Sequence, residues 1–194
     1  MTTRDDLGRR ERIAQASLAI AALAAALASV VLVPGLLGLL GAGLALLMAA
    51  IAAHDARHFA IPNVLNAAAF ALALAHAAVL EPSMIWSAIG MALVRAGATG
   101  GMFLAIKLGY RWWRRRDGLG MGDVKLAAVA GAWLDWLTIP LAVEIAVAAA
   151  LGAYVINRYL RRRPLRATSV LPFGLYLAPA IWAAWLIEAM LFAP

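Results

Sequence analysis

The sequence predicts an all-α, polytopic membrane protein with about seven transmembrane helices. Of its 194 residues, 65% are hydrophobic and 14% are charged, whereas soluble domains average about half apolar and a quarter charged. The mean hydropathy is +0.85. The apolar residues form long runs between short polar or basic loops, and about 20 apolar residues in a helix cross a bilayer core of about 30 Å. We therefore expect the chain to lie in a lipid bilayer.

The first apolar run stands apart from the rest. Residues 1–12 are polar, and an uninterrupted apolar run follows from 13 to 33. The tripeptide Ala26-Leu27-Ala28 resembles a signal-peptidase site, but the length of the run and the acidic residues before it favour a retained helix. We therefore predict a cytoplasmic N-terminus with an extra first transmembrane helix over 1–35, and a membrane domain over 36–194.

Six more helices follow, and proline marks one of their boundaries. Pro62 lacks a backbone donor and disfavours helical geometry at Ile61, so a break must fall near 56–61. Basic loops and short turns separate the other runs. The expected helices cover 36–55, 63–80, 84–109, 123–136, 140–157 and 170–192.

Positive charge alternates between loops. Two loops are basic, at 111–116 and 158–166, whereas 34–35, 81–83 and 135–139 contain no Lys or Arg. Since cytoplasmic loops of membrane proteins carry the excess of Lys and Arg, this alternation predicts a cytoplasmic N-terminus and an external C-terminus. The net charge of +7 is then a topology signal, and we expect no nucleic-acid partner.

Two aspartates fall at the same predicted membrane face. Asp123 ends a run of alternate glycines that begins at Gly118, and it stands where a helix starts. Glycine lacks Cβ and allows another segment to approach closely, although an Asp here could simply cap the helix. Asp55 ends a helix, where a carboxylate faces the negative end of the dipole. Such an unfavourable position indicates a functional role.

Two carboxylates at one depth on different helices fit aspartic proteolysis. One takes a proton from the attacking water, and the other, protonated, polarises the scissile carbonyl. Helix dipoles favour Asp123 as the base and Asp55 as the acid. The alternative is a membrane transporter or pilus-assembly scaffold that uses the two residues as proton or cation sites. His54, Asp55 and His58 could also be read as a metal cluster, but no further ligand stands in register, so we expect no metal.

We expect two other polar residues in the predicted helices to have structural roles. Arg95 lies near mid-membrane and needs a partner, for which we expect Glu144. His76, alone on an apolar run, is expected to be a packing residue with its ring satisfied.

Three motifs resemble one family. Gly120-Met121-Gly122-Asp123 matches the GxGD motif of intramembrane aspartic peptidases. Its continuation, Val124-Lys125-Leu126 with Gly131-Ala132-Trp133-Leu134, resembles the type IV prepilin peptidase branch. Two further segments are similar to that family's first aspartate segment and its C-terminal motif, namely His54-Asp55-Ala56-Arg57 with Ile61-Pro62-Asn63, and Leu171-Pro172-Phe173-Gly174.

The resemblance covers 36–192 and implies a six-helix peptidase core. It implies that Asp55 and Asp123 cleave the basic leader from pilin-like membrane precursors at the cytoplasmic face of the inner membrane, without cofactor or metal. The chain has no cysteine and resembles the short form that lacks the methyltransferase insert. Leu175 stands where many members have proline. Substrate-binding residues are expected in the glycine motif and the C-terminal motif: Gly120, Gly122, Pro172, Phe173 and Gly174.

Overall fold

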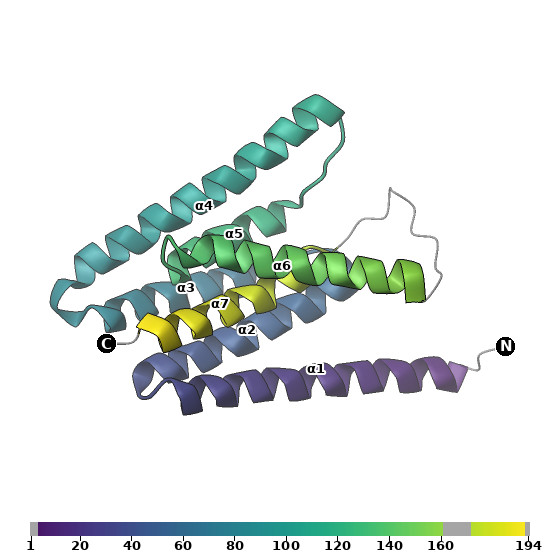
Figure 1. Cartoon of the computed structure of the whole chain (residues 1–194), viewed down its shortest axis with the longest axis horizontal. Coiled ribbons are helices and arrows are strands. Elements are labelled where there is room, and N and C mark those ends of the chain that lie inside the picture. The colour runs from purple at the N-terminus through teal and green to yellow at the C-terminus, as the bar shows by residue number, and fades with distance from the viewer. Residues whose placement is uncertain (1–3, 161–171, 193–194) are drawn as a thin grey trace.

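The computed structural model describes residues 4–160 and 172–192. These residues form seven α-helices and no strand, which confirms the all-α prediction. The helices run broadly along the long axis of the molecule, with α4 inclined to the others (Figure 1). Their bounds are α1 Arg4–Leu32, α2 Leu36–His58, α3 Asn63–Leu80, α4 Ile85–Arg114, α5 Met121–Trp133, α6 Thr138–Val155 and α7 Gly174–Phe192. A 3-10 turn (Pro82–Met84) precedes α4, and a π-helical turn (Ile156–Leu160) continues α6.

Helix ends near the two aspartates differ slightly from the prediction. Helix α2 continues to His58, and Phe59 ends it in the left-handed conformation (φ 52°), with its N–H bonded to the carbonyl of Asp55. Asp55 therefore lies in the last turn of the helix. Helix α5 begins at Met121, so that Asp123 lies in its first turn. Its predicted end at Trp136 was wrong, because Leu134 adopts an extended conformation (φ −97°, ψ 154°) that stops the helix.

Helix α5 is short and central. Six of the described helices are long and apolar enough to cross a membrane, and α5 is not among them. Its 13 residues rise about 20 Å, less than the core thickness of about 30 Å. Contacts with α3, α4 and α7 surround it, and nine of its residues are buried: Asp123, Val124, Leu126, Ala127 and 129–133. A short helix is tolerated at membrane depth when protein covers its ends.

Glycines and small residues let the helices approach closely. A Cβ added at Gly131 of α5 would overlap the carbonyl of Arg95 in α4, and one added at Gly41 of α2 would overlap the ring of Trp185 in α7. Such small residues are typical of helix interfaces in membranes, where van der Waals packing drives association. Helix α1 lies at the edge against α2, and its Ser29 accepts a hydrogen bond of 2.9 Å from the indole of Trp182.

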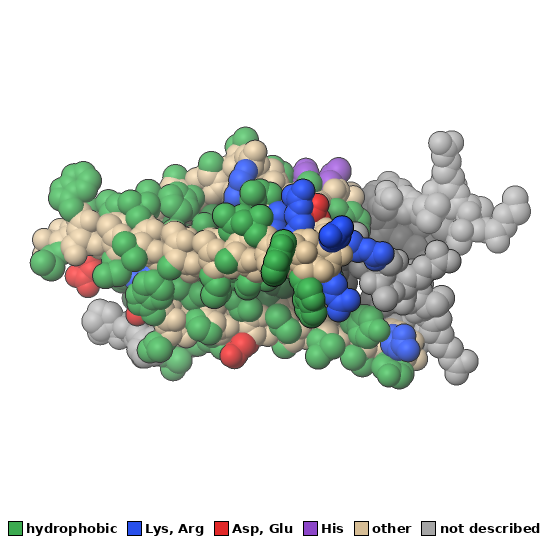
Figure 2. Space-filling model, turned by 90° about the horizontal axis from the view of Figure 1, so that it is seen from above, with side chains coloured by type: hydrophobic (Ala, Val, Ile, Leu, Met, Phe, Trp, Pro, Cys, Tyr) green, Lys and Arg blue, Asp and Glu red, His purple; other side chains and the backbone are tan. Residues whose placement is uncertain are grey.

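The described positive charges gather toward one end of the bundle. The start of α1 and the end of α7 lie at opposite ends of the long axis (Figure 1). In Figure 2, most Lys and Arg side chains on the visible face lie in the half nearer the start of α1. By their places in the helices, the described basic residues near this end of the bundle are Arg57, Lys107, Arg111, 114–116, Lys125 and Arg158. Of the second basic loop, 161–166 lies outside the described residues.

Arg95 is the exception to this distribution. It donates hydrogen bonds of 3.3 Å to the carbonyl of Gly131 and to the carboxylate of Asp135. Glu144 is exposed on α6, so the predicted Arg95–Glu144 pair was wrong. The reason is helix packing, since α4 lies against α5 and has no substantial contact with α6.

Candidate active site

Asp55 and Asp123 are both buried at the end of the bundle where the basic residues gather. Their exposed fractions are 4% and 9%. Asp55 projects from the last turn of α2 and Asp123 from the first turn of α5. The Asp123 carboxyl lies within the electrostatic field of Asp55 and of the backbone N–H of Gly174. The fold therefore brings together the two carboxylates that the sequence singled out.

The start of α7 holds the first carboxylate. The N–H of Leu175 donates a 3.0 Å hydrogen bond to Oδ2 of Asp55, and Gly174 is so close that an added Cβ would lie 2.9 Å from the same oxygen. The first N–H groups of a helix are free donors at the positive end of its dipole. Asp55 thus faces a positive helix end as well as the negative end of its own helix. The dipole difference on which the acid and base roles were predicted is therefore smaller than the sequence suggested.

The glycine motif holds the second carboxylate. The N–H of Gly120 donates a 3.1 Å hydrogen bond to Oδ2 of Asp123, so the carboxylate folds back over the start of its own helix. Gly120 is exposed and Gly122 is half-buried. Because glycine has no side chain, the exposed backbone of Gly120 is accessible beside the buried carboxylate.

Ile61 joins the two aspartate segments, a contact that the sequence reasoning did not predict. An added Cβ at Gly122 would lie 3.0 Å from Cβ of Ile61, and one at Gly174 would lie 2.7 Å from its Cδ1. The buried Ile61 side chain thus fits between the first turns of α5 and α7 because both positions are glycine. In the sequence Ile61 stood out only by its place before Pro62 and in the segment that resembles the family's first aspartate segment, and neither observation indicates which helices it contacts.

The segment before α7 completes the site. The carbonyl of Phe173 accepts hydrogen bonds from the N–H groups of Tyr176 and Leu177, at 3.0 and 2.9 Å, and so begins the helix. Phe173 packs against the buried core, and Pro172 is half-buried beside it. Leu171, the first residue of the C-terminal motif, lies outside the described residues. Substrate binding by Pro172, Phe173 and Gly174 remains a prediction.

Two lysines form hydrogen bonds with segments near the aspartates. Lys107 of α4 donates a 2.7 Å hydrogen bond from Nζ to the carbonyl of Leu119, inside the glycine motif. Lys125 of α5 donates one of the same length to Oδ1 of Asn63, at the start of α3. Neither contact could be read from the sequence, since each joins residues from different helices or loops. The Lys107 contact restrains the glycine motif before Asp123, and the Lys125 contact joins the first turn of α5 to the start of α3.

We expect Lys107→Met to lower kcat for peptide cleavage about tenfold, because small displacements of a reacting group are costly. Lys107→Arg should recover most of the activity, since it can still donate to the Leu119 carbonyl. Arg111→Met, one turn further along α4, is the matched control, because the side chain of Arg111 forms an exposed ion pair of 3.9 Å with Asp117 and has no hydrogen bond to the glycine motif among the described residues. Equal losses in the two Met variants would mean that the general basic charge, and not the loop contact, matters.

The described residues offer no metal site around Asp55. The rings of His54 and His58 stack at 4.3 Å, and Nδ1 of His54 lies 2.8 Å from the carbonyl of Ala60. Within ranges 4–160 and 172–192, no three His, Cys, Asp or Glu residues are grouped to hold a metal. The histidine cluster therefore lacks a third ligand among these residues.

The sequence matches that of known proteins over both aspartate segments. A model of the type IV leader peptidase family matches residues 42–156, which include both aspartates. The chain belongs to the type IV leader peptidase family. It is a membrane-embedded protease of the aspartic type. The family match ends before the segment 172–174, so it does not test the substrate-binding residues expected there.

Individual relatives support the same assignment. The chain is 34% identical to the leader peptidase HopD of Escherichia coli over 126 residues, which cover 65% of this chain and 78% of that protein. It is 39% identical to HopD of Salmonella typhimurium over 99 residues, which cover 51% of this chain and 58% of that protein. It is 41% identical to the prepilin leader peptidase/N-methyltransferase of Pseudomonas aeruginosa over 71 residues, which cover 37% of this chain and 24% of that protein. No solved structure matches the chain.

Proposed function

We propose that this protein is a prepilin leader peptidase that uses Asp55 and Asp123 as its catalytic pair at the cytoplasmic face of the inner membrane. The observation that carries the proposal is the meeting of two buried carboxylates from different helices at the start of α7. All three similar proteins described above carry the words leader peptidase in their names, and one of these names also contains the word prepilin. The basic end of the bundle supports the cytoplasmic assignment of this end.

The chemistry follows from two carboxylates that share one proton. The ionised carboxylate removes a proton from water, the water oxygen bonds to the scissile carbonyl carbon, and the protonated carboxyl donates to the carbonyl oxygen. The tetrahedral intermediate then collapses, the C–N bond breaks, and the leaving amine takes a proton from the carboxyl that gained one from water. As the C=O bond re-forms, the hydroxyl made from the carbonyl oxygen returns its proton to the other carboxylate. The N–H groups of Gly120 and Leu175 hold the two side chains in place, and such preorganised donors lower the cost of charge movement.

The substrate reaches this site as an extended chain. Peptidases cut backbone that is not in a helix, and the exposed Gly120 leaves room for a strand-like segment beside Asp123. A precursor with a basic leader keeps that leader on the cytoplasmic side, while its apolar helix stays in the bilayer. The scissile bond then lies at the membrane surface, level with the aspartates.

Cleavage by the purified protein tests the proposal. The chain, reconstituted in liposomes, is incubated with a membrane precursor that carries a short basic leader followed by glycine and an apolar helix. Mass spectrometry should find a single cut between leader and helix. The transporter alternative predicts instead a proton or cation flux that the liposomes report by an internal pH dye. Flux without cleavage would favour the transporter.

Orientation in the membrane is tested separately. Seven crossings with a cytoplasmic N-terminus place the basic loops inside and the C-terminus outside. Reporter fusions after Arg116 and after Arg163 should therefore be active as cytoplasmic fusions, and a fusion at Pro194 should be active as an external one. A cytoplasmic C-terminus would show that one predicted crossing, such as the short α5, does not pass through the bilayer.

A further inference from the structure

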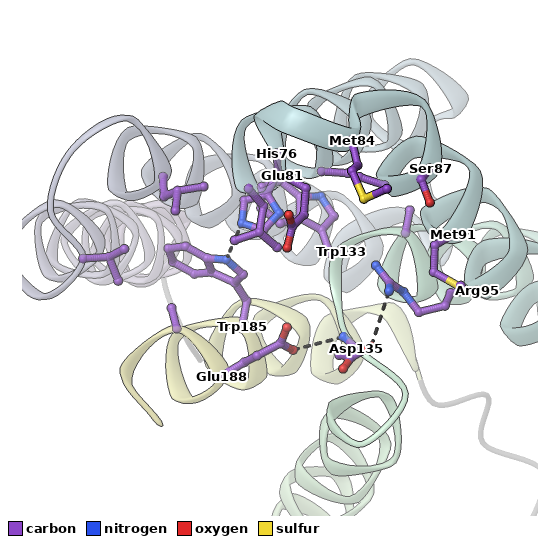
Figure 3. A pocket seen from close by; sticks show the side chains of 17 residues that line it. His76, Glu81, Met84, Ser87, Met91, Arg95, Trp133, Asp135, Trp185 and Glu188 are labelled. Carbon is purple, nitrogen blue, oxygen red and sulfur yellow. Dashed lines mark hydrogen bonds and ion pairs between the residues drawn. The ribbon is translucent and has the colours of Figure 1, made fainter. Parts of the chain in front are cut away.

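A cavity of about 520 Å³ lies toward the ends of α5 and α7 that are farther from Asp123 and Leu175, and Figure 3 shows the side chains that line it. It is lined by the end of α3, the start of α4, the end of α5 and the last turns of α7. Asp123 stands at the start of α5 and Leu175 at the start of α7, so these two helices connect the site to the cavity. Nothing in the proposed peptidase chemistry uses this space.

The inner wall of the cavity is apolar and fixed. His76 accepts a 3.1 Å hydrogen bond at Nε2 from the indole of Trp185, and its ring lies 4.6 Å from that of Trp133. All three side chains are buried, which confirms that His76 is a satisfied packing residue. The outer wall is open, because Met84 and Met91 on the α4 side are 65% and 48% exposed.

Both signs of charge face the cavity. Arg95 is held by Gly131 and Asp135, and Figure 3 shows its guanidinium directed toward the cavity from α4. Glu188 accepts hydrogen bonds from the backbone N–H of Asp135 and from the hydroxyl of Thr138. Glu81 is exposed, and its carboxylate has no ion pair or side-chain hydrogen bond with any described residue.

We propose that this cavity binds a phospholipid whose headgroup carries a primary ammonium. The phosphate would bind the free N–H groups of Arg95, which match phosphate geometry. The ammonium would bind Glu81 and Glu188, and an acyl chain would pass between the exposed methionines into the bilayer. An interior with apolar walls and a few placed polar groups is typical of small-molecule sites.

Charge balance selects this lipid class over others. Three carboxylates and one guanidinium line the cavity, so an anionic headgroup without an amine would face an excess of negative charge. A choline headgroup is positively charged but has no N–H to donate to the carboxylates. An inorganic phosphate would leave the apolar wall and the Glu81 carboxylate without a partner. A zwitterion with an ammonium gives a partner both to the remaining N–H groups of Arg95 and to the carboxylate of Glu81.

Thermal unfolding of the purified full chain in detergent tests this inference. It is titrated with short-chain phosphatidylethanolamine, phosphatidylcholine and phosphatidylglycerol. Selective binding to the folded state raises Tm in a saturable manner, and we expect this for phosphatidylethanolamine, with an apparent Kd at least about tenfold tighter than for the other two lipids. Equal effects of the three lipids, or a preference for phosphatidylglycerol, would overturn the proposal.

Matched variants locate the site. Ala88→Phe places a ring in the cavity wall and should abolish the selective rise in Tm, whereas Leu93→Phe on the exposed side of α4 should leave it unchanged. Glu81→Gln removes a charge that has no partner in the described chain, and it should weaken binding of phosphatidylethanolamine about tenfold without altering the Tm of the lipid-free protein. Unchanged binding in both Ala88→Phe and Glu81→Gln would place the lipid elsewhere. These experiments measure lipid binding and not leader cleavage. Their outcome is therefore independent of whether the proposed peptidase function is correct.

Discussion

Asp55→Asn and Asp123→Asn should each reduce leader cleavage by about 10⁴-fold or more, because neither carboxylate can do the work of the other. The double variant should be no worse than either single variant, since residues that act as a unit show strongly non-additive losses. Both side chains are buried at the same site. The measurement is the initial rate of product formation by purified variants in liposomes.

Asparagine is close in size to aspartate, and its amide oxygen can still accept the N–H of Leu175 or Gly120. Both variants should therefore fold and insert as the unchanged protein does. Their Tm checks folding, and membrane fractionation checks insertion. Asp117→Asn is the matched control, because it makes the same chemical change at an exposed carboxylate near the glycine motif. Cleavage within tenfold of the starting rate by either Asp55→Asn or Asp123→Asn would rule out the aspartic pair.

Gly174→Ala should lower kcat/KM about 100-fold, the second largest effect that we expect. The added Cβ would lie 2.9 Å from Oδ2 of Asp55 and 2.7 Å from Cδ1 of Ile61. Contacts this short force the start of α7 away from α2, which breaks the 3.0 Å hydrogen bond from Leu175 to Asp55. The carboxylate then loses its fixed direction, so the loss should appear mainly in kcat.

Gly97→Ala and Gly101→Ala provide the control for this prediction. Both glycines lie inside α4, and an added Cβ at either would meet no heavy atom within 4 Å. Alanine is the better helix former by about 1 kcal/mol, so these variants should keep full activity. If Gly174→Ala were as active as these two, the contact between α7 and Asp55 would not matter to catalysis.

The sequence alone was sufficient to locate the helices and to single out Asp55 and Asp123 as a pair. Each helix is a local run of apolar residues, and its ends are set by nearby residues such as Pro62 and by the glycine motif. The expected and observed starts of α2 and α3 coincide for this reason. The two motifs also placed Asp55 and Asp123 at one end of the bundle, because an even number of crossings separates the start of α3 from the start of α5.

Only the tertiary structure decided which helix faces meet. Arg95 pairs with Asp135 and not with Glu144, Ile61 fits between two glycines, and the start of α7 reaches Asp55. In a soluble helix, the apolar face shows which side is buried. Here the lipid-facing side is apolar as well, since lipid tails are as apolar as leucine. The pattern of apolar residues therefore identifies the helices but not their rotation, and the packing of small residues between helices fixes the contacts around the aspartates and the cavity.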